Sequence, residues 1–142
     1  MSGSSMIKST TMSKASLFCS LARYAAAGDL HTTPTDYAKF LIEVIDPKHS
    51  DAFRLNKESL LEMLRPQVKV DDSCSWALGW KIQHTEKGDF IQHSGSNDGF
   101  NAFAAASGAG KFGFVIMTNG ENGFKVIGHE IFKKVMKRFI GG

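Results

Sequence analysis

The amino-acid sequence predicts an α+β fold, in which N-terminal helices and a C-terminal helix pack on an antiparallel sheet. Three observations support this prediction. Apolar residues recur at helical spacing in the first half of the chain. From Ser75 onward they alternate with smaller or polar residues in short runs that turn-forming residues separate. The last segment returns to helical spacing. Helices and strands that are segregated along the chain are typical of the α+β class.

Composition and length are those of one folded domain. The chain has 142 residues, of which 42% are hydrophobic and 22% charged, which favours a globular fold over disorder. Residues 1–14 are polar and rich in Ser and Thr, and we expect them to form a flexible leader. Residues 15–142 should form the folded region, with helices within 15–66, and strands and the terminal helix within 75–140.

The helical half contains three candidate elements. The segment ASLFCSLARYAAAG (15–28) is either a short helix that Gly28 ends or a packed irregular segment. In TTPTDYAKFLIEVIDP, Thr33 is expected to cap a helix in which Pro34 occupies the first position, and Pro47 ends it. The residues at helical spacing there are Tyr37, Phe40, Leu41, Val44 and Ile45. A further helix, NKESLLEMLRP, should begin after Asn56. Its residues expected to face inward are Leu60, Leu61 and Leu64.

The second half predicts a sheet followed by a helix. The expected antiparallel strands are Trp76–His84, Phe90–His93, Asn101–Ala106 and Phe112–Thr118. Trp76, Leu78, Trp80 and Ile82 alternate along the first of them. Phe114 and Ile116 should share one face of the last. The terminal helix should run from Phe124 to Phe139, lie across one face of the sheet, and bury Ile127 and Ile131.

Charge and cysteine patterns argue against several classes of function. The net charge is +3, and only KKVMKR (133–138) is locally basic, as on the solvated face of a helix. Aromatic residues are not interleaved with basic ones, so we expect no nucleic-acid partner. Cys19 and Cys74 lack zinc-ligand spacing, and we expect neither a metal nor a cofactor. The sequence does not establish a disulfide between them. It contains no long apolar span and no signal-peptide core, and localisation stays open.

The stretch QHSGSNDGFNAF (92–103) is the strongest candidate for a functional site. On a strand, His93 and Gly95 would point to one side and Ser94 to the other. Glycine allows a ligand backbone to approach closely, and the N–H group that follows it can point at a developing oxyanion. SGSNDG is also good turn chemistry. The residues alone therefore leave a plain turn and an active-site wall both open.

This stretch and its surroundings resemble a known family. LGW…QHSGSNDGFNAFAAASGAGKFGFVIMTNG is similar to the C-terminal part of the serine β-lactamase and penicillin-binding protein superfamily, closest to the branch with class C β-lactamases, esterases and D-amino-acid peptidases. That branch carries a Lys-Thr-Gly or His-x-Gly triplet and then a Gly-Phe pair, here His93–Gly95 and Gly99–Phe100. AAAGDLHTTPTDYAKFL is similar to an upstream segment of the branch. The resemblance covers roughly Ala25 to Lys137.

The resemblance implies a partial β-lactamase or transpeptidase-like fold and a set of roles. His93 and Ser96 would be catalytic, with the Ser96 N–H group as oxyanion donor and His93 in place of the family's lysine. Ser94, Gly95 and Asn97 would bind substrate. The substrate would be a small molecule or peptide: a β-lactam, an ester or a D-amino-acid peptide. A neutral imidazole carries no fixed charge for a β-lactam carboxylate, which favours the ester and peptide substrates.

Two family motifs are weak or missing. The family uses Ser-x-x-Lys and a Tyr-x-Asn element. The sequence has no Tyr-x-Asn, and its one Ser-x-x-Lys, Ser5–Lys8, lies in the polar leader. We therefore expect a fragment or truncated member of this serine hydrolase family that contributes the active-site wall. The alternative is an inactive binding or interaction domain, so whether the chain is an enzyme stays open. Open sheet edges predict self-association, or a missing N-terminal segment or second chain.

Overall fold

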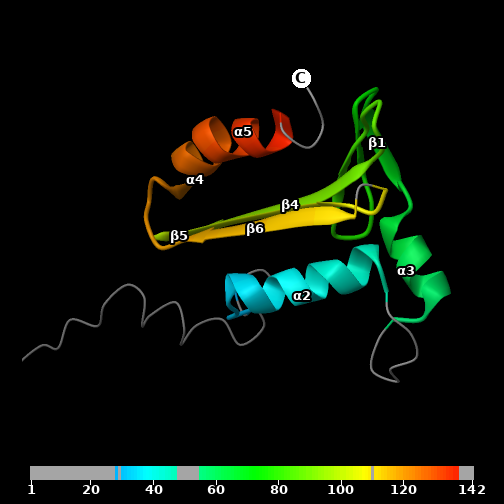
Figure 1. Ribbon diagram of the computed structural model, residues 1–142, viewed down its shortest axis with the longest axis horizontal. Helices are drawn as coiled ribbons and strands as arrows, with labels where there is room; N and C mark the ends of the chain where they lie inside the picture. Colours follow the sequence, from blue (N-terminus) through cyan, green and yellow to red (C-terminus); the bar gives the residue numbers. More distant parts are fainter. Residues whose placement is uncertain (1–27, 29, 48–54, 110, 138–142) are drawn as a thin grey trace, which may run out of the picture. The chain divides into compact units, whose positions relative to one another are not determined.

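The computed structural model describes residues 28, 30–47, 55–109 and 111–137. The chain divides into two compact units, 1–31 and 32–142, and the elements below belong to the second. The expected leader, with Ser5 and Lys8, lies outside the described residues, as does the candidate helix before Gly28. In the second unit a six-stranded antiparallel sheet carries helices on both faces (Figure 1). This confirms the α+β class.

The sheet is a meander in which each strand pairs with the next along the chain. Its strands are β1 (Val68–Asp71), β2 (Cys74–Trp76), β3 (Lys81–Gln83), β4 (Phe90–Asn97), β5 (Phe100–Ser107) and β6 (Phe112–Thr118). β6 has the expected bounds. β1 was not expected from the sequence, because its apolar alternation covers only the four residues VKVD, all of which are exposed.

The prediction of one strand over Trp76–His84 is wrong. The chain leaves the sheet after β2 and returns at β3. The turn between them is closed by a 2.8 Å hydrogen bond from the Ala77 N–H group to the Trp80 carbonyl. Gly79 adopts a φ of +80°, which other residues rarely adopt. The Leu78 N–H group donates to the Met63 carbonyl instead of to a neighbouring strand.

The apolar side chains of residues 76–82 differ in burial on the two sides of this turn. Trp80 and Ile82 are buried, whereas Trp76 is 44% exposed and Leu78 is 54% exposed. An alternating apolar pattern can continue across a turn that reverses the chain, and the sequence pattern therefore joined two strands into one.

The hairpin of β4 and β5 is longer than expected. β4 continues past His93 to Asn97, which pairs with Phe100. Only Asp98 and Gly99 form the turn, and Gly99 has a φ of +77°. Residues 94–97 of the segment SGSNDG thus belong to a strand and not to the turn.

Helix α2 (Pro34–Ile45) forms as the sequence predicts. The Thr33 side chain accepts a hydrogen bond from the Asp36 N–H group at 3.1 Å and donates to the Asp36 carboxylate at 3.0 Å. Lys39 adds a 2.7 Å ion pair to Asp36. Leu41 and Val44 are the buried residues of the helix.

Helix α3 (Lys57–Leu64) is capped by the Asn56 side chain, which accepts from the Ser59 N–H group at 2.8 Å. Leu60 is buried and Leu64 partly buried, as expected. The prediction that Leu61 faces inward is wrong, because its side chain is 61% exposed. In so short a helix only one narrow stripe reaches the core.

The core between α2 and the sheet contains residues from both halves of the chain. Its buried members are Leu41, Val44, Leu60, Ala77, Trp80, Ile82, Ile91, Ala104 and Ala106. Gly113 of β6 lies directly under α2. A Cβ atom there would stand 3.2 Å from Leu41 Cδ2 and 3.0 Å from the Cβ atom of Ala106. Glycine therefore lets the helix approach the sheet closely.

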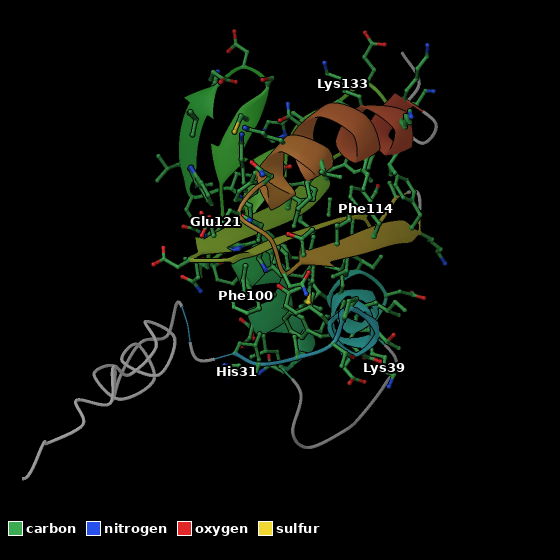
Figure 2. All side chains as sticks on the ribbon, turned by 90° about the vertical axis from the view of Figure 1, so that its left-hand side faces the viewer. His31, Lys39, Phe100, Phe114, Glu121 and Lys133 are labelled. Carbon is green, nitrogen blue, oxygen red and sulfur yellow. The ribbon has the colours of Figure 1, made fainter. Side chains whose placement is uncertain are left out.

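A helical segment covers the opposite face of the sheet (Figures 1 and 2). It comprises α4 (Gly123–Val126), a π-helical turn η1 (Ile127–Ile131) and α5 (Phe132–Met136). Ile127 is 2% exposed, which confirms its expected burial, whereas Ile131 is partly buried. The expected end at Phe139 lies outside the described residues. No helix in the described part of the chain combines the length and apolar character that a membrane span requires.

Candidate functional site

One edge of β4 is free where the His-Ser-Gly triplet stands. β3 pairs with β4 only as far as Lys81 opposite Gln92. β4 then runs on to Asn97, with β5 along its other side. Within the described ranges, no strand lies on the β3 side of residues 93–97. This segment, called here the β4 edge, therefore has backbone groups without a strand partner.

The register shows which backbone groups face outward. Asn97 and Phe100 flank a two-residue turn, so they exchange backbone hydrogen bonds with each other. Pairing between β4 and β5 then continues without a shift. Because the bonding direction alternates along a strand, Gly95 also bonds toward β5. The N–H and C=O groups of Ser94 and Ser96 therefore point away from β5, out of the β4 edge.

The side chains of the triplet lie on different faces. His93 pairs with Ala104, a member of the core beneath α2, and Gly95 shares that face. Ser94 pairs with Phe103, which contacts Phe114 on the face of the terminal helix. The β4 edge therefore presents serine backbone groups outward, while serine side chains and the imidazole lie on opposite faces of the sheet.

The Ser96 end of the edge is held by a buried amide. Ser96 Oγ donates to Asn101 Oδ1 at 3.0 Å, and Asn101 Nδ2 donates to the Gly120 carbonyl at 2.8 Å. Asn101 is 5% exposed. Gly123 packs so tightly here that a Cβ atom would lie 2.8 Å from Asn101 Nδ2. These contacts fix the end of β4 to the connection between β6 and α4.

The His93 end of the edge carries a group of aromatic rings. Trp80 immediately precedes β3, and its ring meets that of His93 edge-on, with centroids 6.4 Å apart. Phe40 of α2 stacks on Trp80 at 6.3 Å, and Tyr37 contacts Phe40 at 5.5 Å. Burial raises the pKa of the Tyr37 hydroxyl above its ordinary value. Its side chain is therefore neutral over the physiological range, and Tyr37, Phe40 and Trp80 are called here the aromatic group.

A second constellation was missed from the sequence. His84 Nε2 lies 2.8 Å from Ser75 Oγ, and His84 Nδ1 lies 3.0 Å from Asp89 Oδ1. These are the atoms that a Ser-His-Asp triad uses. Ser75, however, is only 4% exposed, so a substrate carbonyl has no path to its hydroxyl. We assign this relay a structural role, because it links β2 to the turn between β3 and β4. No sequence signal could reveal it, because the contact depends on the register of β2 and β3.

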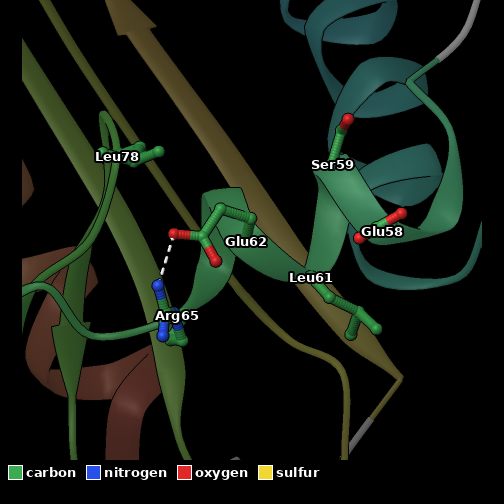
Figure 3. A pocket seen from close by; sticks show the side chains of 6 residues that line it. All are labelled: Glu58, Ser59, Leu61, Glu62, Arg65 and Leu78. Carbon is green, nitrogen blue, oxygen red and sulfur yellow. Dashed lines mark hydrogen bonds and ion pairs between the residues drawn. The ribbon is translucent and has the colours of Figure 1, made fainter.

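A surface hollow lies between α3 and the turn that carries Leu78 (Figure 3). Its lining residues are Glu58, Ser59, Leu61, Glu62, Arg65 and Leu78. Arg65 donates to Glu62 at 2.6 Å. That hydrogen bond, with a second one from Gln67, lowers the pKa of the Glu62 carboxyl. Glu62 and Arg65 are thus paired with each other, and none of the lining residues belongs to the triplet, so we do not assign the site here.

Metal ligands do not gather in the part of the chain that the structure describes. No group of three or more His, Cys, Asp or Glu side chains there could hold a metal ion. Of the two cysteines, Cys74 is buried with a free thiol, and Cys19 lies outside the described residues.

Comparison with known families decides the relationship. The family model described as Beta-lactamase matches residues 5–132. The chain belongs to the beta-lactamase family. A search of curated proteins gave no match. The beta-lactamase match begins well before Ala25, where the resemblance was expected to start, and includes both the Ser5–Lys8 motif and the β4 edge. Membership places the chain in a family of serine hydrolases.

Proposed function

We propose that the β4 edge is the substrate-binding wall of an acyl-transfer site and that it binds an extended ester or peptide. One observation carries the proposal. The pairing of β3 with β4 stops at Gln92. The edge of β4 is therefore free from His93 onward, where the family triplet begins. An extended ligand can add to such an edge through main-chain hydrogen bonds. The outward backbone groups of Ser94 and Ser96 are the partners for those bonds.

Gly95 supports the same assignment. Its φ is not positive, and a Cβ atom there would meet no protein atom within 4 Å. Neither backbone strain nor packing within the described residues explains a glycine at this position. Close approach of a ligand does explain it, in contrast to Gly113, where packing under α2 is sufficient.

The proposed roles follow from this geometry. The Ser96 N–H group would donate to the oxyanion, and Asn101 holds the residue in place through its side chain. Removing a single oxyanion donor typically costs about 10²–10³ in kcat. His93 would join the proton network or contact the substrate's polar end, while Ser94, Gly95 and Asn97 line the ligand.

The serine side chains of the β4 edge are poorly placed to act as the nucleophile. The hydroxyl groups of Ser94 and Ser96 belong to the opposite sheet face from His93, so neither is suited to attack a ligand beside the imidazole. Ser5 with Lys8 is the remaining candidate. This favours a second candidate function, a binding module that holds acyl donors without turning them over.

Backbone NMR tests the binding wall. We would titrate the chain with an acyl-D-alanyl-D-alanine peptide and with a nitrophenyl ester. The amide signals of Ser94 and Ser96 should shift, whereas those of Val115 and Met117 on the edge of β6 should not. Gly95→Val should weaken binding while keeping the circular dichroism spectrum, and Gly108→Ala is the matched control. Equal shifts on both edges, or none at Ser94 and Ser96, would contradict the proposal.

A further inference from the structure

We infer that the aromatic group selects acyl donors with an aromatic or bulky apolar acyl substituent, which packs on Phe40. This inference rests on the proposed function, because it needs a ligand along the β4 edge. It concerns a property that the binding wall alone does not fix, namely which acyl groups are preferred.

The position of Trp80 is the first step. Lys81 pairs with Gln92, so continuing this register by one residue sets Trp80 opposite His93. Their ring contact agrees with that placement. Trp80 therefore lies next to the start of the β4 edge, just outside the paired part of β3. A ligand that binds along the edge would contact the aromatic group at that end.

The exposure of Phe40 is the second step. Trp80 is 5% exposed, whereas Phe40, stacked on it with an interplanar angle of 20°, is 49% exposed. One ring thus anchors the group in the core, and the other offers apolar surface to a ligand. Tyr37 holds Phe40 from the side through an edge contact. A ring held by two neighbours loses little freedom when it binds a ligand, which favours affinity.

Chemistry is the third step. Tyr37, Phe40 and Trp80 are uncharged. They therefore provide no positive charge that could bind an anionic acyl group. They offer ring faces and edges, which bind aromatic partners in stacked or edge-on arrangements. The other end of the β4 edge is different, because Ser96 there is bonded to the amide of Asn101. The two ends therefore orient a ligand, with its apolar substituent toward Phe40.

The test uses two ligands that differ in one group: the phenylacetyl and acetyl derivatives of D-alanyl-D-alanine. Dissociation constants come from NMR titration of the full chain. The phenylacetyl ligand should bind about tenfold more tightly, the upper range expected for one aromatic pair. Phe40→Ala should remove this preference, so that the two ligands bind with equal affinity. Phe40→Leu, which keeps apolar packing, should retain only part of it.

Ile42 supplies the matched control, since it lies on the same helix and is 50% exposed. Ile42→Ala should keep the preference. If neither ligand binds, the proposed function fails and the inference fails with it. If both bind equally, the binding wall stands and the inference is overturned. It is also overturned if Phe40→Ala keeps the preference, or if it changes the sedimentation of the free chain, because another segment or a second copy would then cover Phe40.

Discussion

Trp80 and His93 meet with their ring planes 85° apart and their centroids 6.4 Å apart. The contact joins the last residue before β3 to the first residue of the β4 edge. It couples a buried core tryptophan to an exposed imidazole, so His93 is positioned by the core although its side chain is accessible. A change on either side of this contact should therefore be measurable on the other.

Catalysis by the chain should be slight. Ser5, the candidate nucleophile, belongs to a segment with no apolar residues at helical spacing to hold it against the sheet, and a misplacement of about 1 Å can cost on the order of a hundredfold in rate. We expect little or no hydrolysis of a nitrophenyl ester or a chromogenic cephalosporin. Any trace should disappear in Ser5→Ala and in Lys8→Ala. Robust turnover that Ser5→Ala abolishes would make SMIK the working motif. Turnover that survives Ser5→Ala but not His93→Ala would indicate another nucleophile.

The relay between Ser75 and His84 should contribute to stability and not to binding. His84→Ala leaves a buried hydroxyl without its partner, which costs about 1–3 kcal/mol of the free energy of unfolding. Adding Ser75→Ala should recover part of this loss, because the unpaired group is then removed. Urea unfolding of the two single variants and the double variant measures the coupling. Strict additivity, or a change in ligand affinity, would argue against a structural link.

Acid should weaken the fold through three carboxyl groups. The hydrogen bond from Lys39 lowers the pKa of Asp36, that from Arg65 lowers the pKa of Glu62, and those from Ser73 lower the pKa of Asp71. Their stabilising effect is complete above the ordinary carboxyl pKa of about 4. It is lost as the pH falls through the lowered values.

Thermal unfolding between pH 7 and pH 2 measures this effect. The melting temperature should fall mainly below about pH 4, and added salt should reduce the slope because all three groups are exposed. Asp36→Asn should flatten the curve at low pH relative to the unchanged chain. A melting temperature that rises on acidification would contradict the assignment of these hydrogen bonds.

Self-association should use the edge of β6 rather than that of β1. β1 has a register shift between Lys69 and Asp71 and carries charges, both of which discourage edge pairing. β6 is regular and uncharged. Ala102 exchanges backbone hydrogen bonds with Gly95 of β4, so its partner on β6, Met117, is not hydrogen-bonded to it. The Met117 N–H group therefore points out of the free edge of β6. Sedimentation velocity should therefore show concentration-dependent dimers that Met117→Pro reduces and Lys69→Pro does not. A clean monomer over a wide concentration range would refute the expected self-association.

Local chemistry in the sequence was sufficient for several elements. Thr33 and Pro34 define the start of α2 whatever packs on it, because a capping side chain and a proline ring act within one helical turn. β6 has the bounds that its apolar run predicts, since turn residues flank it on both sides. Asp98 and Gly99 form the turn where glycine is needed, and the His93–Gly95 triplet was found where the edge of β4 is free.

Tertiary structure decided the features that depend on partners distant in the chain. The break between β2 and β3 involves the Leu78 backbone bond to Met63, and alternation alone could not reveal it. Because of that break, β3 begins only at Lys81, opposite Gln92. The β4 residues beyond Gln92 therefore have no β3 partner. The contacts between His84 and Ser75 and between Phe40 and Trp80 likewise cross elements. Sequence fixes conformations through interactions within a few residues, whereas a strand edge is free or covered only through the register of its neighbours.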